Sequence, residues 1–272
     1  MKNYFLIFIF FISTAIAENT PDTLIFNIGD TKYNLTPRTN NSFTYGEKLK
    51  FKVYYGIING GTAELEIADK PKIINGRNSF HIKIYGKSTG IVDVMFRVKD
   101  QFESYLDEEY LVPWKATKNV KEGNYKSIDL ILFDQLNGIA HSNEKGKIEI
   151  AEYTQDVASC LYFARSTDMS NARPGDVFPV NFYLDGKNYG LRFKYIGTEN
   201  IKTDLGTFRT LKIKPQLLEG RVFKDSEALT LWVTDDENKI PIRAESAIFV
   251  GAVKMDLVEY SGLKNPMNAK LR

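Results

Sequence analysis

Cysteine and histidine are scarce in this chain of 272 residues, and their scarcity excludes several kinds of site. Cys160 is the single cysteine, so no disulfide can form within the chain. His81 and His141 are the only histidines, and neither has a second ligand at metal-binding spacing. Glycine-rich phosphate loops, dinucleotide fingerprints and G-x-S-x-G motifs are also absent from the sequence. We therefore expect no metal, no cofactor and no catalytic residue. The sequence leaves the binding residues unknown.

An excess of charge of one sign is missing as well. Lysine and arginine total 36 and aspartate and glutamate total 34, which gives a formal net charge of +2. Because nucleic-acid binding ordinarily requires a strongly basic surface, we expect no nucleic-acid partner. The sequence also contains no polybasic block of the kind that attaches a segment to an anionic membrane.

A long apolar run occurs only at the N-terminus. Lys2 precedes the apolar residues 4–12, and Ala15-Ile16-Ala17 forms an A-x-A cleavage motif before Glu18. These parts are typical of a secretory signal peptide over residues 1–17, cleaved between Ala17 and Glu18. No transmembrane segment is then expected in the mature chain. Since exported eukaryotic proteins of this size often carry several cysteines, the single cysteine favours the periplasm of a Gram-negative cell, with an extracellular location as the alternative.

Strand-forming residues are abundant. Aromatic residues make up 13% of the chain, and β-branched and aromatic residues recur in short runs separated by Gly, Asn and Asp. The clearest alternation, at residues 48–67, predicts a hairpin with Lys52 opposite Glu64 and Lys50 opposite Glu66. Short spacing between runs indicates antiparallel pairing. Further strands are expected at residues 79–85, 91–99, 102–107, 127–133, 177–184, 189–196, 206–214, 227–234, 240–247 and 252–260.

One segment has helical spacing instead. In residues 156–165 the apolar side chains of Val157, Cys160 and Leu161 fall on one face, and Asp156 suits the N-cap. This spacing predicts a helix with Cys160 as a small buried core residue. We therefore predict an all-β fold, built as a large curved antiparallel sheet or incomplete β-barrel with one central helix. A two-sheet β-sandwich is the alternative.

The same patterns divide the chain into parts. Residues 1–17 form the signal peptide and residues 18–42 an N-terminal arm and linker. Residues 43–262 form the β-rich domain, with its helix near residues 156–165, and residues 263–272 are expected to be a flexible tail.

Several motifs occur in order: FTYGEKL (43–49), YGIINGGTA (55–63), KDQFES (99–104), QDVASCLYFAR (155–165), KPQLLEG (214–220), LWVTDD (231–236), then Pro241 and Gly251. Together they resemble the exported bacterial family known as domain of unknown function 3108. The resemblance covers residues 43–260 and implies an envelope protein of Gram-negative bacteria, with no reaction attached to it. Glu47, Asp100, Arg165 and Trp232 are the motif members with notable side chains, for which capping, an ion pair and a core aromatic are sufficient roles.

These observations favour a non-catalytic periplasmic envelope protein that binds an apolar ligand, such as a lipid chain, or an envelope protein. One alternative is a glycan-acting hydrolase, and another is an assembly or scaffold protein that adds a partner's strand to a sheet edge. The hydrolase would use carboxylates from one crowded region: Asp93, Asp100, Glu103, Asp107, Glu108 and Glu109.

Overall fold

The computed structural model describes residues 32, 34–217, 229–247 and 252–271, which form one antiparallel sheet and two helices and confirm the predicted all-β fold. The predicted signal peptide, its cleavage point between Ala17 and Glu18, and most of the N-terminal arm lie outside these residues. In chain order the elements are β1 (Lys48–Tyr55), β2 (Ile58–Ile67), β3 (Lys72–Ile74), β4 (Arg77–Ser88), α1 (Gly90–Met95), β5 (Val98–Asp107), β6 (Pro113–Glu122), β7 (Tyr125–Asp134), β8 (Ile139–Ser142), β9 (Gly146–Glu149), α2 (Val157–Arg165), β10 (Val177–Leu184), β11 (Lys187–Thr203), β12 (Gly206–Leu217), β13 (Leu229–Thr234), β14 (Pro241–Ala247) and β15 (Ala252–Ser261).

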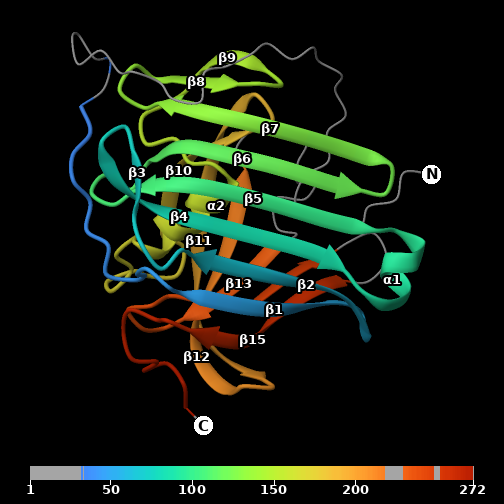
Figure 1. Ribbon diagram of the computed structural model, residues 1–272. Helices are drawn as coiled ribbons and strands as arrows, with labels where there is room; N and C mark the ends of the chain where they lie inside the picture. Colours follow the sequence, from blue (N-terminus) through green and yellow to red (C-terminus); the bar gives the residue numbers. More distant parts are fainter. Residues whose placement is uncertain (1–31, 33, 218–228, 248–251, 272) are drawn as a thin grey trace.

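The sheet is a single curved surface. Its strands run in the order β10 to β15, then β1, β2 and β4 to β9, with β3 attached to β4. The curvature brings β10–β13 behind β4–β6 (Figure 1). In the described part of the chain no strand ladder joins β9 to β10. Backbone at Gln155 lies along β10 instead: its N–H donates to Asn181 O and its carbonyl accepts from Tyr183 N, both at 2.8 Å. The result is an incomplete barrel.

Helix α2 lies on the concave side of this sheet, where it contacts β4, β5 and β10 (Figure 1). Its start follows from local chemistry, because the Asp156 carboxylate accepts from the backbone N–H of Ala158 at 2.8 Å and of Ser159 at 3.1 Å. The Ser159 hydroxyl accepts in return from the Asp156 N–H at 2.9 Å, which completes a capping box. The predicted helix is therefore confirmed.

The buried face of α2 fills the centre of the main core. Tyr162 is fully buried, and its ring meets Phe43 edge-on with 5.0 Å between centroids. Cys160 belongs to the same cluster with 6% of its surface exposed, and burial raises the pKa of its thiol. The prediction that Cys160 is a small buried core residue is therefore confirmed.

The segment at residues 91–99, expected to be one strand, contains a helix instead. Helix α1 occupies Gly90–Met95, and β5 begins only at Val98. The β-branched residues Ile91, Val92 and Val94 suggested a strand, yet Gly90 has a φ of 58° that turns the chain at this point. Neither helix in the described residues is long and apolar enough to span a bilayer.

The hairpin of β1 and β2 has the predicted faces but a different register. Lys50 lies opposite Glu64 and Lys52 lies opposite Thr62, two residues away from the predicted pairing. The turn falls at residues 56–57, and a bulge at Val53 and Tyr54 absorbs one residue of β2. Because the shift is an even number of residues, every side chain stays on its predicted face.

Both ends of the described chain lie against the barrel. Residues 34–42 have no strand, and Arg38 donates its backbone N–H to Glu109 O at 2.9 Å. The expected flexible tail is instead held in place as far as Leu271, because Leu271 donates its backbone N–H to Thr207 O at 2.8 Å and Ala269 is fully buried. The polar composition of residues 263–272 suggested a frayed end, because composition does not reveal long-range contacts.

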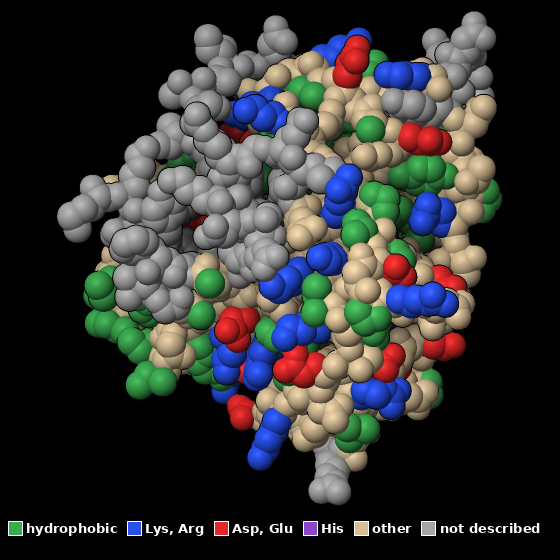
Figure 2. Space-filling view, turned by 180° about the vertical axis from the view of Figure 1, so that it is seen from behind, with side chains coloured by type: hydrophobic (Ala, Val, Ile, Leu, Met, Phe, Trp, Pro, Cys, Tyr) green, Lys and Arg blue, Asp and Glu red, His purple; other side chains and the backbone are tan. Residues whose placement is uncertain are grey.

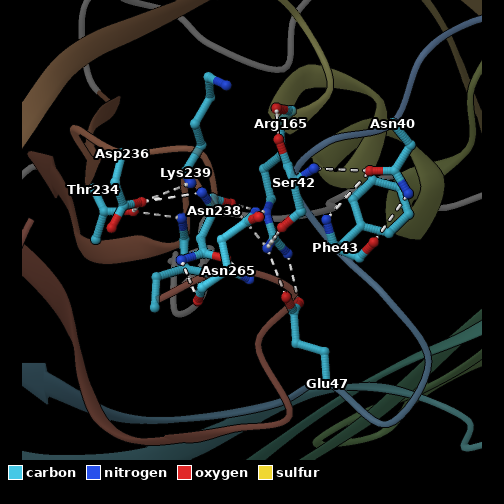
Figure 3. Close-up of polar contacts among 11 residues, drawn as sticks. Asn40, Ser42, Phe43, Glu47, Arg165, Thr234, Asp236, Asn238, Lys239 and Asn265 are labelled. Atoms are coloured by element: carbon cyan, nitrogen blue, oxygen red, sulfur yellow. Dashed lines mark hydrogen bonds and ion pairs between the residues drawn. The ribbon is translucent and has the colours of Figure 1, made fainter. Parts of the chain in front are cut away.

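A buried ion pair connects these segments (Figure 3). Arg165 at the end of α2 donates to both carboxylate oxygens of Glu47, at 2.6 and 2.7 Å. The Nε and Nη2 groups of the guanidinium also donate to the carbonyls of Ser42 and Asn238. Asp236 shapes the turn that carries Asn238 by accepting its N–H at 3.1 Å. The polar residues 235–238 thus form and stabilise the turn between β13 and β14.

Candidate functional site

The carboxylates of the predicted hydrolase region are divided among separate structural contacts. Glu103 lies on the outer face of β5, whereas Asp107 is fully buried. Five of the six have a side-chain partner: Ser88 for Asp93, His81 for Glu103, Tyr45 for Glu108, and Arg77, which is shared by Asp107 and Glu109. These partners satisfy the carboxylates without gathering them into one cleft.

Asp100 differs, because it forms a pair with Glu122 of β6. It shares the inner face of β5 with Val98 and Phe102, and Glu122 is only 3% exposed. The two carboxyl groups interact, and the charge of the Asp100 carboxylate disfavours ionisation of Glu122. Burial raises the pKa of Asp100 to about 6. Burial and the neighbouring Asp100 carboxylate raise the pKa of Glu122 to about 8.

This pair does not fit the predicted hydrolase chemistry. Glycosidases hold their two carboxyl groups roughly 5 Å or more apart, so that the scissile bond and a water fit between them. Glu122 is almost fully buried, so this pair does not face an open cleft in which a glycan could lie. The pair is better explained as an ionisable element of the inner face, beside the ion pair of Lys118 and Asp185.

A row of lysines crosses the outer face of the sheet. Lys87 of β4 is paired with Lys99 of β5, Lys99 with Lys121 of β6, and Lys121 with Lys126 of β7. We call these four residues the lysine row. All four are exposed and lie on successive strands, which are spaced about 4.8 Å apart. The row therefore extends over about 14 Å.

The lysine row lacks ion-pair partners in the part of the chain that the structure describes. None of its four ammonium groups makes an ion pair or side-chain hydrogen bond with another residue in the described ranges. Like charges directly opposite each other on neighbouring strands destabilise a sheet by roughly 0.2–1 kcal/mol per pair. Three consecutive pairs of this kind are an unfavourable arrangement for the isolated protein, and an anion bound across them would relieve it.

A polar hollow of about 310 Å³ adjoins the row on the outer face. Lys87, Lys99 and Lys121 line it together with Tyr85 and Gln101. Asn119 supplies a further wall, and its side-chain oxygen is buried without a hydrogen-bond partner among the described residues. Glu64 is at the β2 side of the hollow. Asp100 also lines the hollow, so three lysines face two carboxylates, and the net positive charge suits an anionic group.

The opposite side of the molecule has a different charge pattern. Seen from behind, basic and acidic side chains are interspersed over the lower part of the surface (Figure 2). Mixed charges of this kind neutralise each other and are ordinary for a soluble surface. The lysine row is thus a local feature rather than a consequence of the overall charge of +2.

Comparison with protein-family profiles identifies the family of this chain. The sequence profile of the family described as protein of unknown function DUF3108 matches residues 50–258. The chain belongs to this DUF3108 family. The match confirms the resemblance seen in the sequence motifs, and it includes the whole lysine row. No curated protein matches the chain.

Three solved structures show different degrees of similarity to the chain. A β-barrel-like protein of the domain of unknown function DUF1849 from Brucella abortus is 6% identical, with a TM-score of 0.52 over 81% of this chain and 99% of that one. A candidate lipoprotein from Parabacteroides distasonis is 14% identical, with a TM-score of 0.31 over 84% of this chain and all of that one. A candidate exported protein from Bacteroides fragilis is 12% identical, with a TM-score of 0.29 over the same shares. At this identity the Brucella structure supports the barrel-like fold alone.

Sequence reasoning missed the lysine row because its members are 5 to 22 residues apart and belong to four strands. Each lysine, taken singly, is an ordinary solvent-facing residue of an alternating strand. Only the register places them side by side. The carboxyl pair of Asp100 and Glu122 was missed for the same reason.

Proposed function

We propose that this protein is an exported, non-catalytic component of the Gram-negative envelope that binds an anionic partner at the lysine row. The observation that carries the proposal is the set of in-register, unpaired lysines beside a polar hollow. Export follows from the signal-peptide pattern at residues 1–17. Binding without catalysis is favoured because the carboxylates at residues 93–109 have structural partners.

An apolar ligand on the concave face has less support. Helix α2 occupies that face and packs its buried residues into the main core. Tyr162, Phe163 and Cys160 fill space that a lipid chain would need. A partner at a sheet edge also has less support, because backbone at Gln155 already pairs with β10.

The test uses inorganic tripolyphosphate as a soluble anionic probe, titrated calorimetrically into protein recovered from the periplasm of an expressing Gram-negative host. The double variant Lys99→Gln/Lys121→Gln should bind at least about tenfold more weakly, because two charge-assisted hydrogen bonds are lost. The control Lys70→Gln/Lys72→Gln removes equal charge at exposed positions near β3 and should bind like the parent protein.

Equal loss in both double variants would mean non-specific charge attraction and would overturn the proposal. Absence of binding by the parent protein at low ionic strength would do the same. Mass spectrometry of the recovered protein tests export directly, since a mature chain beginning at Glu18 is expected.

A further inference from the structure

An apolar tip projects from the end of the sheet where the lysine row lies. It consists of Ile57 and Ile58 at the turn between β1 and β2, together with Ile91, Val94 and Met95 of α1. Their exposed fractions are 100% for Ile57, 44% for Ile58, 57% for Ile91, 79% for Val94 and 80% for Met95. Single exposed apolar residues are common, but several at one protruding end indicate a contact surface.

The two parts of the tip are neighbours in space. Helix α1 contacts β2, and the N–H of Thr89 donates to the carbonyl of Gly60 at 3.0 Å. Val92, the buried residue of α1, lies against Gly60. The outward residues of α1 and the β1–β2 turn therefore lie together at one end of the molecule (Figure 1).

The tip is continuous with the lysine row. Helix α1 is the connection between β4 and β5, so Lys87 lies three residues before Gly90 and Lys99 lies four residues after Met95. Lys121 and Lys126 continue the row from Lys99 along neighbouring strands. An exposed apolar end thus adjoins a row of lysines that have no ion-pair partners among the described residues.

We infer that this surface docks on a lipid bilayer that contains anionic phospholipids. The tip enters the boundary between headgroups and acyl chains, and the lysine row lies over the lipid phosphates. This inference rests on the proposed anion binding, and it identifies the anion as the phosphate of a membrane lipid. A free phosphate would account for the lysines, whereas only a surface with an apolar interior behind its anions also accounts for the tip.

The strength expected of such a surface is moderate. Each lysine close to an anionic leaflet contributes about 1 kcal/mol, which corresponds to about a fivefold change in partitioning. Burial of exposed apolar side chains adds to this attraction, and neither contribution alone gives stable attachment. Binding should therefore need both parts and should weaken as ionic strength rises.

Vesicle binding tests the inference with protein recovered from the periplasm. Flotation is measured with phosphatidylcholine vesicles that contain or lack phosphatidylglycerol. The reporter variant Val94→Trp follows insertion by its fluorescence, with brominated lipids as quenchers and the buried Trp114 and Trp232 as internal background. The test variants are Lys99→Gln/Lys121→Gln and Met95→Ser. Their matched controls at the far end of the sheet are Lys70→Gln/Lys72→Gln and Ile73→Ser, Ile73 being 63% exposed.

The parent protein should float only with anionic vesicles, and brominated lipid should quench the reporter. The lysine double variant should lose about 25-fold in partitioning, Met95→Ser should bind several-fold more weakly, and both controls should bind as the parent does. An unquenched reporter, equal binding to neutral vesicles, or equal losses in the controls would overturn the inference. If tripolyphosphate binds through the lysine row while anionic vesicles do not, membrane docking fails and the proposed anion binding stands. If neither binds, both fail.

Discussion

At the scale of single residues, the Asp100–Glu122 pair makes stability depend on pH. The raised pKa of Glu122 means that the folded chain keeps a proton which the unfolded chain releases near the usual carboxyl pKa of 4.5. This stabilising contribution is complete below that value and is lost as pH rises toward about 8. The pair thus favours the folded state in mildly acidic solution.

Replacing Glu122 by glutamine should remove this dependence. We expect the free energy of unfolding of the parent protein to fall between about pH 5 and pH 8, and Glu122→Gln to show a shallower fall. Asp129 and Asp156 also have raised pKa values, but they contribute equally to both proteins. Urea unfolding at several pH values measures the difference. Parallel curves for the two proteins would contradict the assignment.

At the scale of strands, the lysine row favours anion binding but lowers the stability of the sheet. Lys99 of β5 has a lysine directly opposite on both neighbouring strands, Lys87 on β4 and Lys121 on β6. Two like-charge pairs at adjacent positions are a cost that a sheet with alternating charges would avoid. Their presence is expected where a surface is shaped for a ligand rather than for stability.

Reversing the central charge should therefore stabilise the isolated protein. Lys99→Glu converts two repulsive cross-strand pairs into attractive ones and should raise the free energy of unfolding by about 0.5–2 kcal/mol at low salt. The gain should shrink at high salt, where exposed charges are screened. Urea unfolding gives the measurement, and Lys70→Glu serves as the control, with an expected change within about 0.5 kcal/mol. A salt-independent loss of stability in Lys99→Glu would be evidence against a repulsive row.

At the scale of the whole molecule, one ion pair holds together segments that are remote in sequence. Arg165 and Glu47 are 118 residues apart, and their side chains are 1% and 0% exposed. Through Ser42 and Asn238 the same guanidinium also reaches the N-terminal segment and the β13–β14 turn (Figure 3). The pair thus fixes α2 inside the barrel rather than stabilising a single element.

Breaking this pair should be severe. Arg165→Met leaves the Glu47 carboxylate buried without its cation and should lower the free energy of unfolding by about 3–5 kcal/mol. The double variant Glu47→Leu/Arg165→Met removes both charges and should be more stable than Arg165→Met alone. A double-mutant cycle by urea unfolding measures this coupling. Additive losses would show that the two charges act independently.

Much of the architecture could be predicted from local pattern. Alternation in residues 48–67 assigned each side chain to its face, because successive side chains of a strand point to opposite sides whatever the strand pairs with. The helix at α2 followed from helical spacing and an N-cap aspartate, which are also local. Signals spread over a few residues sufficed for these elements.

Local sequence patterns did not predict helix α1 or the packing of the C-terminal tail against the barrel. The strand-forming residues of α1 adopt a short helix beside Gly60, and the polar tail is ordered by Asn238 and Thr207, which are distant in sequence. Tertiary contacts override propensity in such short segments because each local preference is worth only a fraction of a kcal/mol.

The sequence by itself determined the fold class, the central helix, the family and the buried state of Cys160. The candidate site was decided only by tertiary structure. Its lysines come from four strands, and strand register places them side by side. The register of these strands depends on the bulge between Tyr105 and Leu106 and on the positions of the turns, so it is a property of the assembled sheet and no single segment encodes it.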